Sequence, residues 1–130
     1  MIVVDASVLV TALGHDGEEG RRVRERLRGQ RVFAPEIVDL EVASYVRRAR
    51  RDDRIGPQRA VQALADLALA SIARVSHTPF LSRIWDLRDN VSPYDAAYVA
   101  LAEVMEAQLL TADARLARAP RLACEVVLIS

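Results

Sequence analysis

The sequence predicts an α/β fold in which one parallel sheet is covered by helices on both faces. Short, continuous apolar runs, typical of strands that are buried on both faces, recur along the 130 residues. Longer segments with helical patterning separate these runs, and this alternation is typical of parallel α/β architecture. The length predicts a single domain, residues 1–130, that is large enough to bury a core.

The first half of the chain predicts two strands and three helices around a polar turn. The strands are 2–4 and 31–34, and Pro35 is expected to end the second. A short helix over 7–13 follows the first strand. A turn over 15–20, which contains His15, leads into an arginine-rich helix that ends near residue 29. A longer helix is expected over 36–51.

The second half predicts helices over 56–71, 80–89, 92–107 and 112–119, and strands over 72–75, 108–111 and 126–129. The start at residue 92 is well marked. Ser92 is a good N-cap, Pro93 suits the first turn, and Asp95 stands three residues after the cap, as in a capping box. The helix behind it is apolar on most sides, so we expect it to be buried with its first-turn carboxylate directed inward.

Composition excludes several classes of function. All 18 basic residues are arginine and 18 residues are acidic, so the formal net charge is zero and no global field attracts nucleic acid. A P-loop needs a lysine. The one cysteine, Cys124, excludes an internal disulfide and a cysteine-based zinc site. Neither a signal peptide nor an apolar run of membrane-spanning length is present, so we expect an intracellular, cytoplasmic protein.

Four acidic residues stand where such a fold would bring them to one edge of the sheet. Asp5 and Asp113 directly follow predicted strands, and Glu41 and Asp95 lie early in helices that start at the same edge. Hard divalent cations prefer carboxylate oxygens, and a carboxylate pocket that holds one or two of them can hydrolyse phosphodiesters. The sequence therefore predicts a metal site.

Each acid also has a structural interpretation. Asp5, Asp95 and Asp113 suit helix capping. Glu41 suits a structural role least, since it falls between Ile37 and Tyr45 on the apolar side of its helix and needs a cation or a donor there. If the four carboxylates converge to within ~5 Å, each pair repels by ~3 kcal/mol at an effective dielectric constant of ~20. Convergence therefore implies a metal ion.

Four segments carry a resemblance to the PIN-domain ribonucleases, specifically the VapC-type toxins of toxin–antitoxin pairs. They are VDASV at 4–8, IVDLEVASYVRR at 37–48, SPYDAAYVALA at 92–102 and LLTADARLA at 109–117. Each motif alone is unspecific, but the four occur in order and at compatible spacing over nearly the whole chain. The fourth motif departs from the pattern, with Leu116 where an aromatic residue is frequent, and Asp86 and Asp89 are alternatives to Asp113.

The resemblance implies a PIN-like fold with a five-stranded parallel sheet in the order 3-2-1-4-5. It implies an endoribonuclease that depends on Mg²⁺ or Mn²⁺, inhibits translation or growth, forms a homodimer and is inhibited by a cognate antitoxin. The metal ligands would be Asp5, Glu41, Asp95 and Asp113, supported by Ser7 and Thr111.

Several alternatives stay open at this stage. A non-catalytic PIN-like module that binds RNA or a partner would keep the fold without the metal. A haloacid-dehalogenase-type phosphatase would need a second aspartate near position 6, and a nucleotide-binding module would need a glycine-rich loop. Two arginine groups, within 21–28 and 47–54, could contact RNA or be solvated helix faces. Apolar residues within 38–46 and 61–69 could line a groove for an antitoxin helix or pack in the core.

Overall fold

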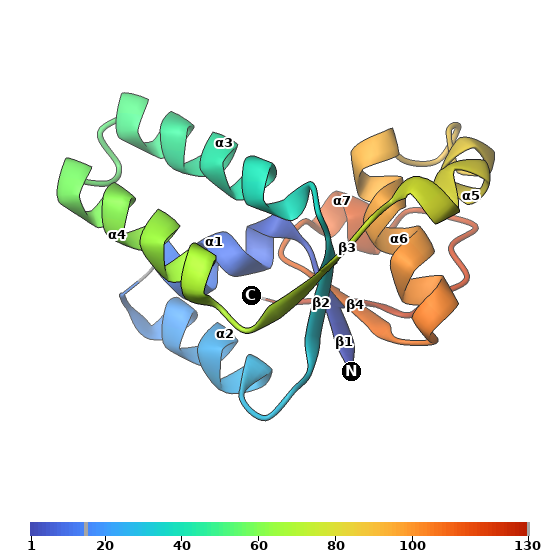
Figure 1. Ribbon diagram of the computed structural model, residues 1–130, viewed down its shortest axis with the longest axis horizontal. Helices are drawn as coiled ribbons and strands as arrows, with labels where there is room; N and C mark the ends of the chain where they lie inside the picture. Colours follow the sequence, from blue (N-terminus) through green and yellow to red (C-terminus); the bar gives the residue numbers. More distant parts are fainter. Residues whose placement is uncertain (15, 130) are drawn as a thin grey trace.

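Five strands form one parallel sheet in the order β3-β2-β1-β4-β5 (Figure 1). The computed structural model describes residues 1–14 and 16–129, so His15 and its predicted turn position lie outside the described residues. The strands are β1 Ile2–Val4, β2 Val32–Pro35, β3 Ile72–Val75, β4 Gln108–Thr111 and β5 Val126–Leu128. The predicted fold class and strand order are confirmed.

Helices cover both faces of this sheet, which makes three layers (Figure 1). One side carries α1 Ala6–Gly14, α2 Glu18–Leu27, α3 Val38–Arg51 and α4 Pro57–Leu69. The other side carries the 3₁₀ turn η1 Thr78–Phe80, α5 Leu81–Asp86 and α6 Pro93–Met105. The short helix α7 Ala114–Ala117 follows β4. Within residues 1–14 and 16–129, no helix has the length and apolar character that crossing a bilayer requires.

Several predicted boundaries differ from the structure by one to three residues, as at Pro35 and in the helices predicted over 80–89 and 112–119. Pro35 lies inside β2 instead of ending it. The N–H of Glu36 donates to Val75 O of β3. Because successive N–H groups of a strand point to opposite sides, the N–H that proline lacks would point toward β1. No bond is lost there, since the last residue of β2 that pairs with β1 is Phe33. The helix predicted over 80–89 shortens to α5, which follows the 3₁₀ turn η1 and ends at Asp86, where a turn begins. The helix predicted over 112–119 shortens to α7 because a turn at Thr111 takes up the preceding residues.

Helix α6 is the most deeply buried of the helices that the structure describes, as its apolar composition predicted. Every residue from Ala96 to Ala102 is buried. Ala96 and Ala100 are completely inaccessible, and their small side chains let the helix lie close against the sheet.

The apolar residues on α3 and α4 divide between the two roles that the sequence predicted, core packing and an exposed partner surface. Those at 38, 42, 46 and 67 are buried in the core, whereas those at 45, 61, 64 and 69 are exposed.

The strand order places the functional edge of the molecule. The chain adds β2 and β3 on one side of β1 and β4 and β5 on its other side, so the order reverses between β1 and β4. Ligands of open parallel sheets bind at the carboxyl ends of the strands at such a reversal. Asp5 follows β1 and Thr111 ends β4, so both residues stand at this switch point.

Candidate active site

A cavity of about 270 Å³ opens at the switch point between β1 and β4. All four predicted acids line it, although they come from four separate parts of the chain. The polar and aromatic residues that line the cavity include Asp5, Ser7, Glu41, Tyr45, Arg48, Ser92, Tyr94, Asp95, Tyr98, Asp113 and Arg115. The four acids thus line one cavity, as the sequence predicted, whereas their approach to within ~5 Å and their catalytic role stay predictions.

Asp5 is the most buried of the four acids, at 7% exposure. One carboxylate oxygen accepts hydrogen bonds from Ser7 Oγ at 2.5 Å and from Val8 N at 3.2 Å. The other oxygen accepts from Thr111 Oγ1 at 2.5 Å. The bond from Val8 N caps α1. Asp5 therefore both caps a helix and lines the cavity, so the two interpretations of this residue are compatible. Burial raises the pKa of Asp5 above its usual value, and the hydroxyl donors offset part of that increase.

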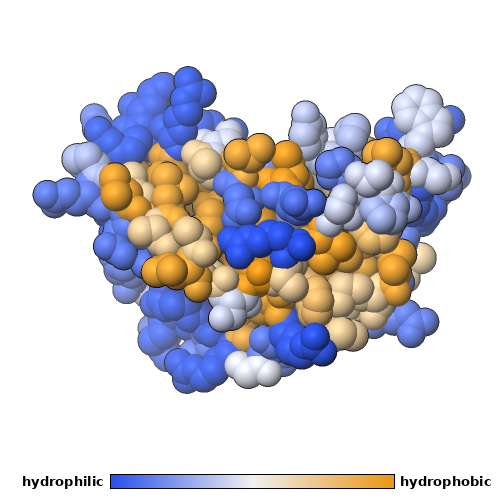
Figure 2. Space-filling view, in the orientation of Figure 1, coloured by the Kyte–Doolittle hydropathy of each residue, from blue (hydrophilic) through white to orange (hydrophobic). Residues whose placement is uncertain are grey.

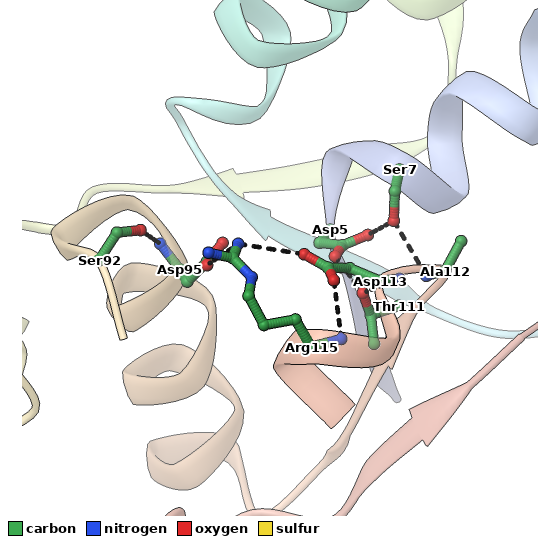
Figure 3. A network of polar contacts seen from close by, with 8 residues as sticks. All are labelled: Asp5, Ser7, Ser92, Asp95, Thr111, Ala112, Asp113 and Arg115. Carbon is green, nitrogen blue, oxygen red and sulfur yellow. Dashed lines mark hydrogen bonds and ion pairs between the residues drawn. The ribbon is translucent and has the colours of Figure 1, made fainter. Parts of the chain in front are cut away.

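Thr111 and Ser7 join the ends of β1 and β4 through Asp5 (Figure 3). Thr111 is fully buried, and its hydroxyl also accepts from Asp113 N–H at 2.9 Å. Ser7 accepts from Ala112 N–H at 2.9 Å. Both predicted supporting residues therefore contact Asp5 and shape the turn that carries Asp113. Asp113 itself accepts from Arg115 N–H at 2.9 Å and caps α7.

Asp95 lies at the first turn of α6, with its backbone held by the predicted cap. Its N–H donates to Ser92 Oγ at 3.1 Å. Its carboxylate faces the cavity and pairs with Arg115 at 3.4 Å (Figure 3). The pKa of Asp95 is raised, chiefly by burial and also by the charge of Asp113, while the charge of Arg115 offsets part of the increase. The burial of the helix directs this acid inward, as the sequence analysis expected.

Glu41 has the hydrogen-bond donor that its place on the apolar side of α3 required. Tyr98, which is almost completely buried on α6, donates its hydroxyl to Glu41 Oε1 at 2.5 Å. Burial raises the pKa of Glu41, and the charges of Asp95 and Asp5 raise it further. Three of the four acids therefore have raised pKa values in part because other acids of the cavity are close, which a bound cation would relieve.

Four further residues line the cavity, and helical spacing holds a signal for three of them. The sequence predicted for Arg48 only a possible RNA contact and for Tyr45 only an apolar groove or core position, and it predicted no role for Tyr98 or Arg115. Tyr45 and Arg48 follow Glu41 by four and seven residues and thus lie on its face of α3. Tyr98 follows Asp95 by three residues in the same way. The Arg48 guanidinium lies over the Tyr45 ring at 4.7 Å from its centroid. Arg115 is the fourth, and its position depends on the turn before α7.

The alternative acids and all but one of the grouped arginines lie away from the cavity. Asp86 and Asp89 are exposed and do not line it, in agreement with their expected place at a solvated helix end. In the first arginine group, Arg21 pairs with Glu18 and Glu25 on the surface of α2, as in a solvated helix. In the second group, Arg48 alone lines the cavity.

The donor chemistry of the cavity suits a hard divalent cation, because such ions take several carboxylate oxygens. In the described part of the chain, however, no three acidic, histidine or cysteine side chains are grouped closely enough to hold an ion. The acids lie around one cavity, and Arg115 lies between two of them. Side-chain rotations around χ1 and χ2 would have to draw the carboxylates together.

Comparison with known proteins gives concordant matches. The PIN domain family matches residues 2–122. Ribonuclease VapC1 of Mycobacterium tuberculosis is 41% identical over 128 residues, which cover 98% of this chain and 96% of that protein. Ribonuclease VapC9 of the same organism is 38% identical over 129 residues, 99% of this chain and 98% of that protein. In solved structures, VapBC2 from Rickettsia felis bound to a DNA fragment from its promoter matches with a TM-score of 0.67 at 16% identity, over all of both chains.

Proposed function

Because the chain belongs to the PIN-domain family and is a VapC ribonuclease, the toxin of a toxin–antitoxin system, we propose that its cavity at the β1–β4 switch point is the RNA-cleaving site. The observation that carries this proposal is the meeting of four acids from four separated segments around one cavity. These acids are Asp5, Glu41, Asp95 and Asp113.

PIN nucleases are generally metal-dependent, and we assign Mg²⁺, with Mn²⁺ as a substitute, to these four carboxylates. The raised pKa values of Asp5, Glu41 and Asp95 support this assignment, since a divalent cation favours the charged forms that burial disfavours. A bound divalent cation would supply a more acidic water and neutralise charge on the phosphate oxygens. Asp5 is held by three donors, and Tyr98 orients Glu41.

The mouth of the cavity has features that suit single-stranded RNA. Tyr45 and Tyr94 line it and expose 39% and 59% of their surfaces, so the Tyr94 ring and the face of the Tyr45 ring that Arg48 does not cover can meet unstacked bases. Arg48 stands over Tyr45 and provides a positive charge for a phosphate. The chain has few aromatic residues, yet two of them are exposed at this rim. We therefore assign single-stranded segments as the substrate class.

A cleavage assay with one labelled RNA, either single-stranded or annealed to its complement, tests both parts of this proposal. In Mn²⁺ the single strand should be cut, and excess EDTA should lower the rate by roughly 100-fold or more, with recovery when Mn²⁺ is restored. The duplex should be cut at least about tenfold more slowly, because paired bases cannot stack on the tyrosines. Undiminished cleavage in EDTA would contradict the metal assignment, and equal cleavage of the duplex would contradict the substrate class.

Two apolar surfaces support the proposed partners, a cognate antitoxin and a second copy of the chain. Helices α1, α3 and α4 enclose a largely apolar cavity of about 300 Å³, and apolar residues gather at the surface on the α4 side of the molecule in Figure 2. Val61 and Leu69 of α4 are 70% and 85% exposed. Neither residue lines that cavity, and we assign the outer side of α4, which carries them, to an apolar antitoxin helix. On α5, Leu81 and Trp85 are also exposed, and we assign them to the homodimer interface.

Two charged substitutions are expected to separate these surfaces. Trp85→Asp should shift the mass measured by light scattering from dimer to monomer, because a carboxylate on each copy would be buried in the interface. Leu69→Asp should weaken capture of the antitoxin encoded with this toxin and leave the dimer mass unchanged. A monomeric wild-type protein would contradict the dimer assignment, and unchanged capture by Leu69→Asp would contradict the antitoxin surface.

A further inference from the structure

Among the ion pairs of the described residues, those that involve an acid of the cavity are both made by Arg115. Its Nη2 atom lies 3.4 Å from Asp95 Oδ2 and 3.2 Å from Asp113 Oδ2, so one guanidinium nitrogen joins two acids from different elements. Figure 3 shows the arginine side chain extended from α7 toward Asp95. The guanidinium thus stands between two of the proposed metal ligands.

The contact follows from the turn after β4. Thr111 accepts from Asp113 N–H, and Asp113 in turn accepts from Arg115 N–H. These bonds fix the backbone of Arg115 beside the acid that it pairs with. The backbone is held by these bonds, whereas the side chain, which is 76% exposed, is held by its pairs with Asp95 and Asp113.

The charges of the cavity make this arginine a counter-ion. Four carboxylates line the cavity together with two arginines, Arg48 and Arg115. Arg48 lies over the Tyr45 ring, whereas Arg115 contacts carboxylate oxygens. Arg115 lowers the pKa of Asp95, while burial and Asp113 raise it. The arginine thus supplies part of the compensation that a metal would supply in full.

We propose that Arg115 competes with the divalent cation for Asp95 and Asp113, so that metal binding requires its guanidinium to leave the cavity. This inference rests on the proposed metal site. A carboxylate oxygen that accepts from the guanidinium is not free to bind a cation at 2.0–2.6 Å. Two like charges at the same pair of oxygens also repel. Arg115 is in this sense a positioning residue that sets metal affinity.

The exchange requires little energy, because the guanidinium end of both ion pairs is exposed to solvent, which weakens them, although the carboxylates are partly buried. A divalent cation interacts more strongly with the same carboxylates than one guanidinium does. Once released, Arg115 remains anchored at the rim of the cavity through its backbone. Its free guanidinium is then available to a phosphate of the RNA.

Isothermal titration of the full-length protein with MnCl₂ tests the competition. Arg115→Gln should bind Mn²⁺ roughly three- to tenfold more tightly than wild type, the effect expected for losing one or two partly exposed ion pairs. Arg118→Gln is the matched control, since it removes the same charge from the same segment. Arg118 is exposed and does not line the cavity. Its Mn²⁺ affinity should stay within about twofold of wild type, because the effect requires the contact with Asp95 and Asp113.

A second measurement follows the arginine itself. Mg²⁺ added to protein with ¹⁵N-labelled arginine should shift one side-chain Nε–H resonance that is missing in the Arg115→Gln spectrum. Unchanged or weaker Mn²⁺ binding by Arg115→Gln, or equal tightening by Arg118→Gln, would overturn the competition while the metal site itself stands. If the wild-type protein binds no Mn²⁺, both the inference and the metal assignment fail.

Discussion

Asp5→Asn should abolish RNA cleavage, with a loss of roughly 1000-fold or more, while the protein stays folded. The substitution keeps the shape of the side chain and removes the charge of the most buried acid of the cavity. Asp5 is the acid that Ser7, Val8 and Thr111 all hold in place. Losing several kcal/mol of metal-dependent stabilisation corresponds to about three orders of magnitude in rate. A fluorogenic RNA assay in Mn²⁺ measures the effect.

The stability of the same variant separates loss of chemistry from loss of fold. The raised pKa of Asp5 means that the folded protein holds its charged form less favourably than the unfolded chain does. Removing the charge should therefore offset the loss of one acceptor oxygen, and the thermal midpoint measured in EDTA should stay close to that of wild type. Asp89→Asn is the matched control, because Asp89 is exposed and away from the cavity, and it should keep full activity. Normal cleavage by Asp5→Asn would contradict the proposed site.

Ala100→Leu should reduce both stability and metal binding, because it acts on the helix that carries Asp95. Ala100 is completely buried at the centre of α6, which packs against the sheet. The larger side chain has no room there, and overpacking of this kind costs about 1–3 kcal/mol. Displacing α6 also moves Asp95 and Tyr98, and a shift of about 1 Å in a catalytic group can lower the rate by about 100-fold. Chemical denaturation and Mn²⁺ titration measure the two effects.

Val104→Leu provides the control for this experiment on the same helix. Val104 is 67% exposed, so a larger apolar side chain meets solvent and not the sheet. Its stability and Mn²⁺ affinity should stay close to those of wild type. Equal behaviour of Ala100→Leu and Val104→Leu would mean that α6 does not position the site through its packing.

The strands and most helices of this protein were predictable because their signals are local. Continuous apolar runs predicted all five strands to within a residue or two, and the cap at Ser92 predicted the start of α6. The errors arose where a neighbour decides the outcome. Pro35 could stay in β2 only because it lies beyond the last pair with β1. The helix after β4 shortened because Thr111 and Asp113 bond to each other.

The four acids were predictable for a similar reason. Asp5 and Asp113 follow strands, Asp95 follows a cap, and Glu41 interrupts an apolar face, and each of these features can be read in a few neighbouring residues. Their partners could not be read in this way. The bonds from Tyr98 to Glu41 and from Thr111 to Asp5 join residues 57 and 106 positions apart. Only the packing of α6 on the sheet and the pairing of β1 with β4 bring them together.

The sequence by itself thus determined the class of fold, the edge at which the acids gather and the chemistry that carboxylates offer there. The tertiary structure decided how those acids are held and which cation stands among them. Arg115 appears as an ordinary surface arginine in the sequence, and its two acidic partners lie 2 and 20 residues away. The physical reason is range: strand and helix signals act between neighbours, whereas the electrostatics of a cavity depends on side chains that only the folded chain brings within a few ångströms.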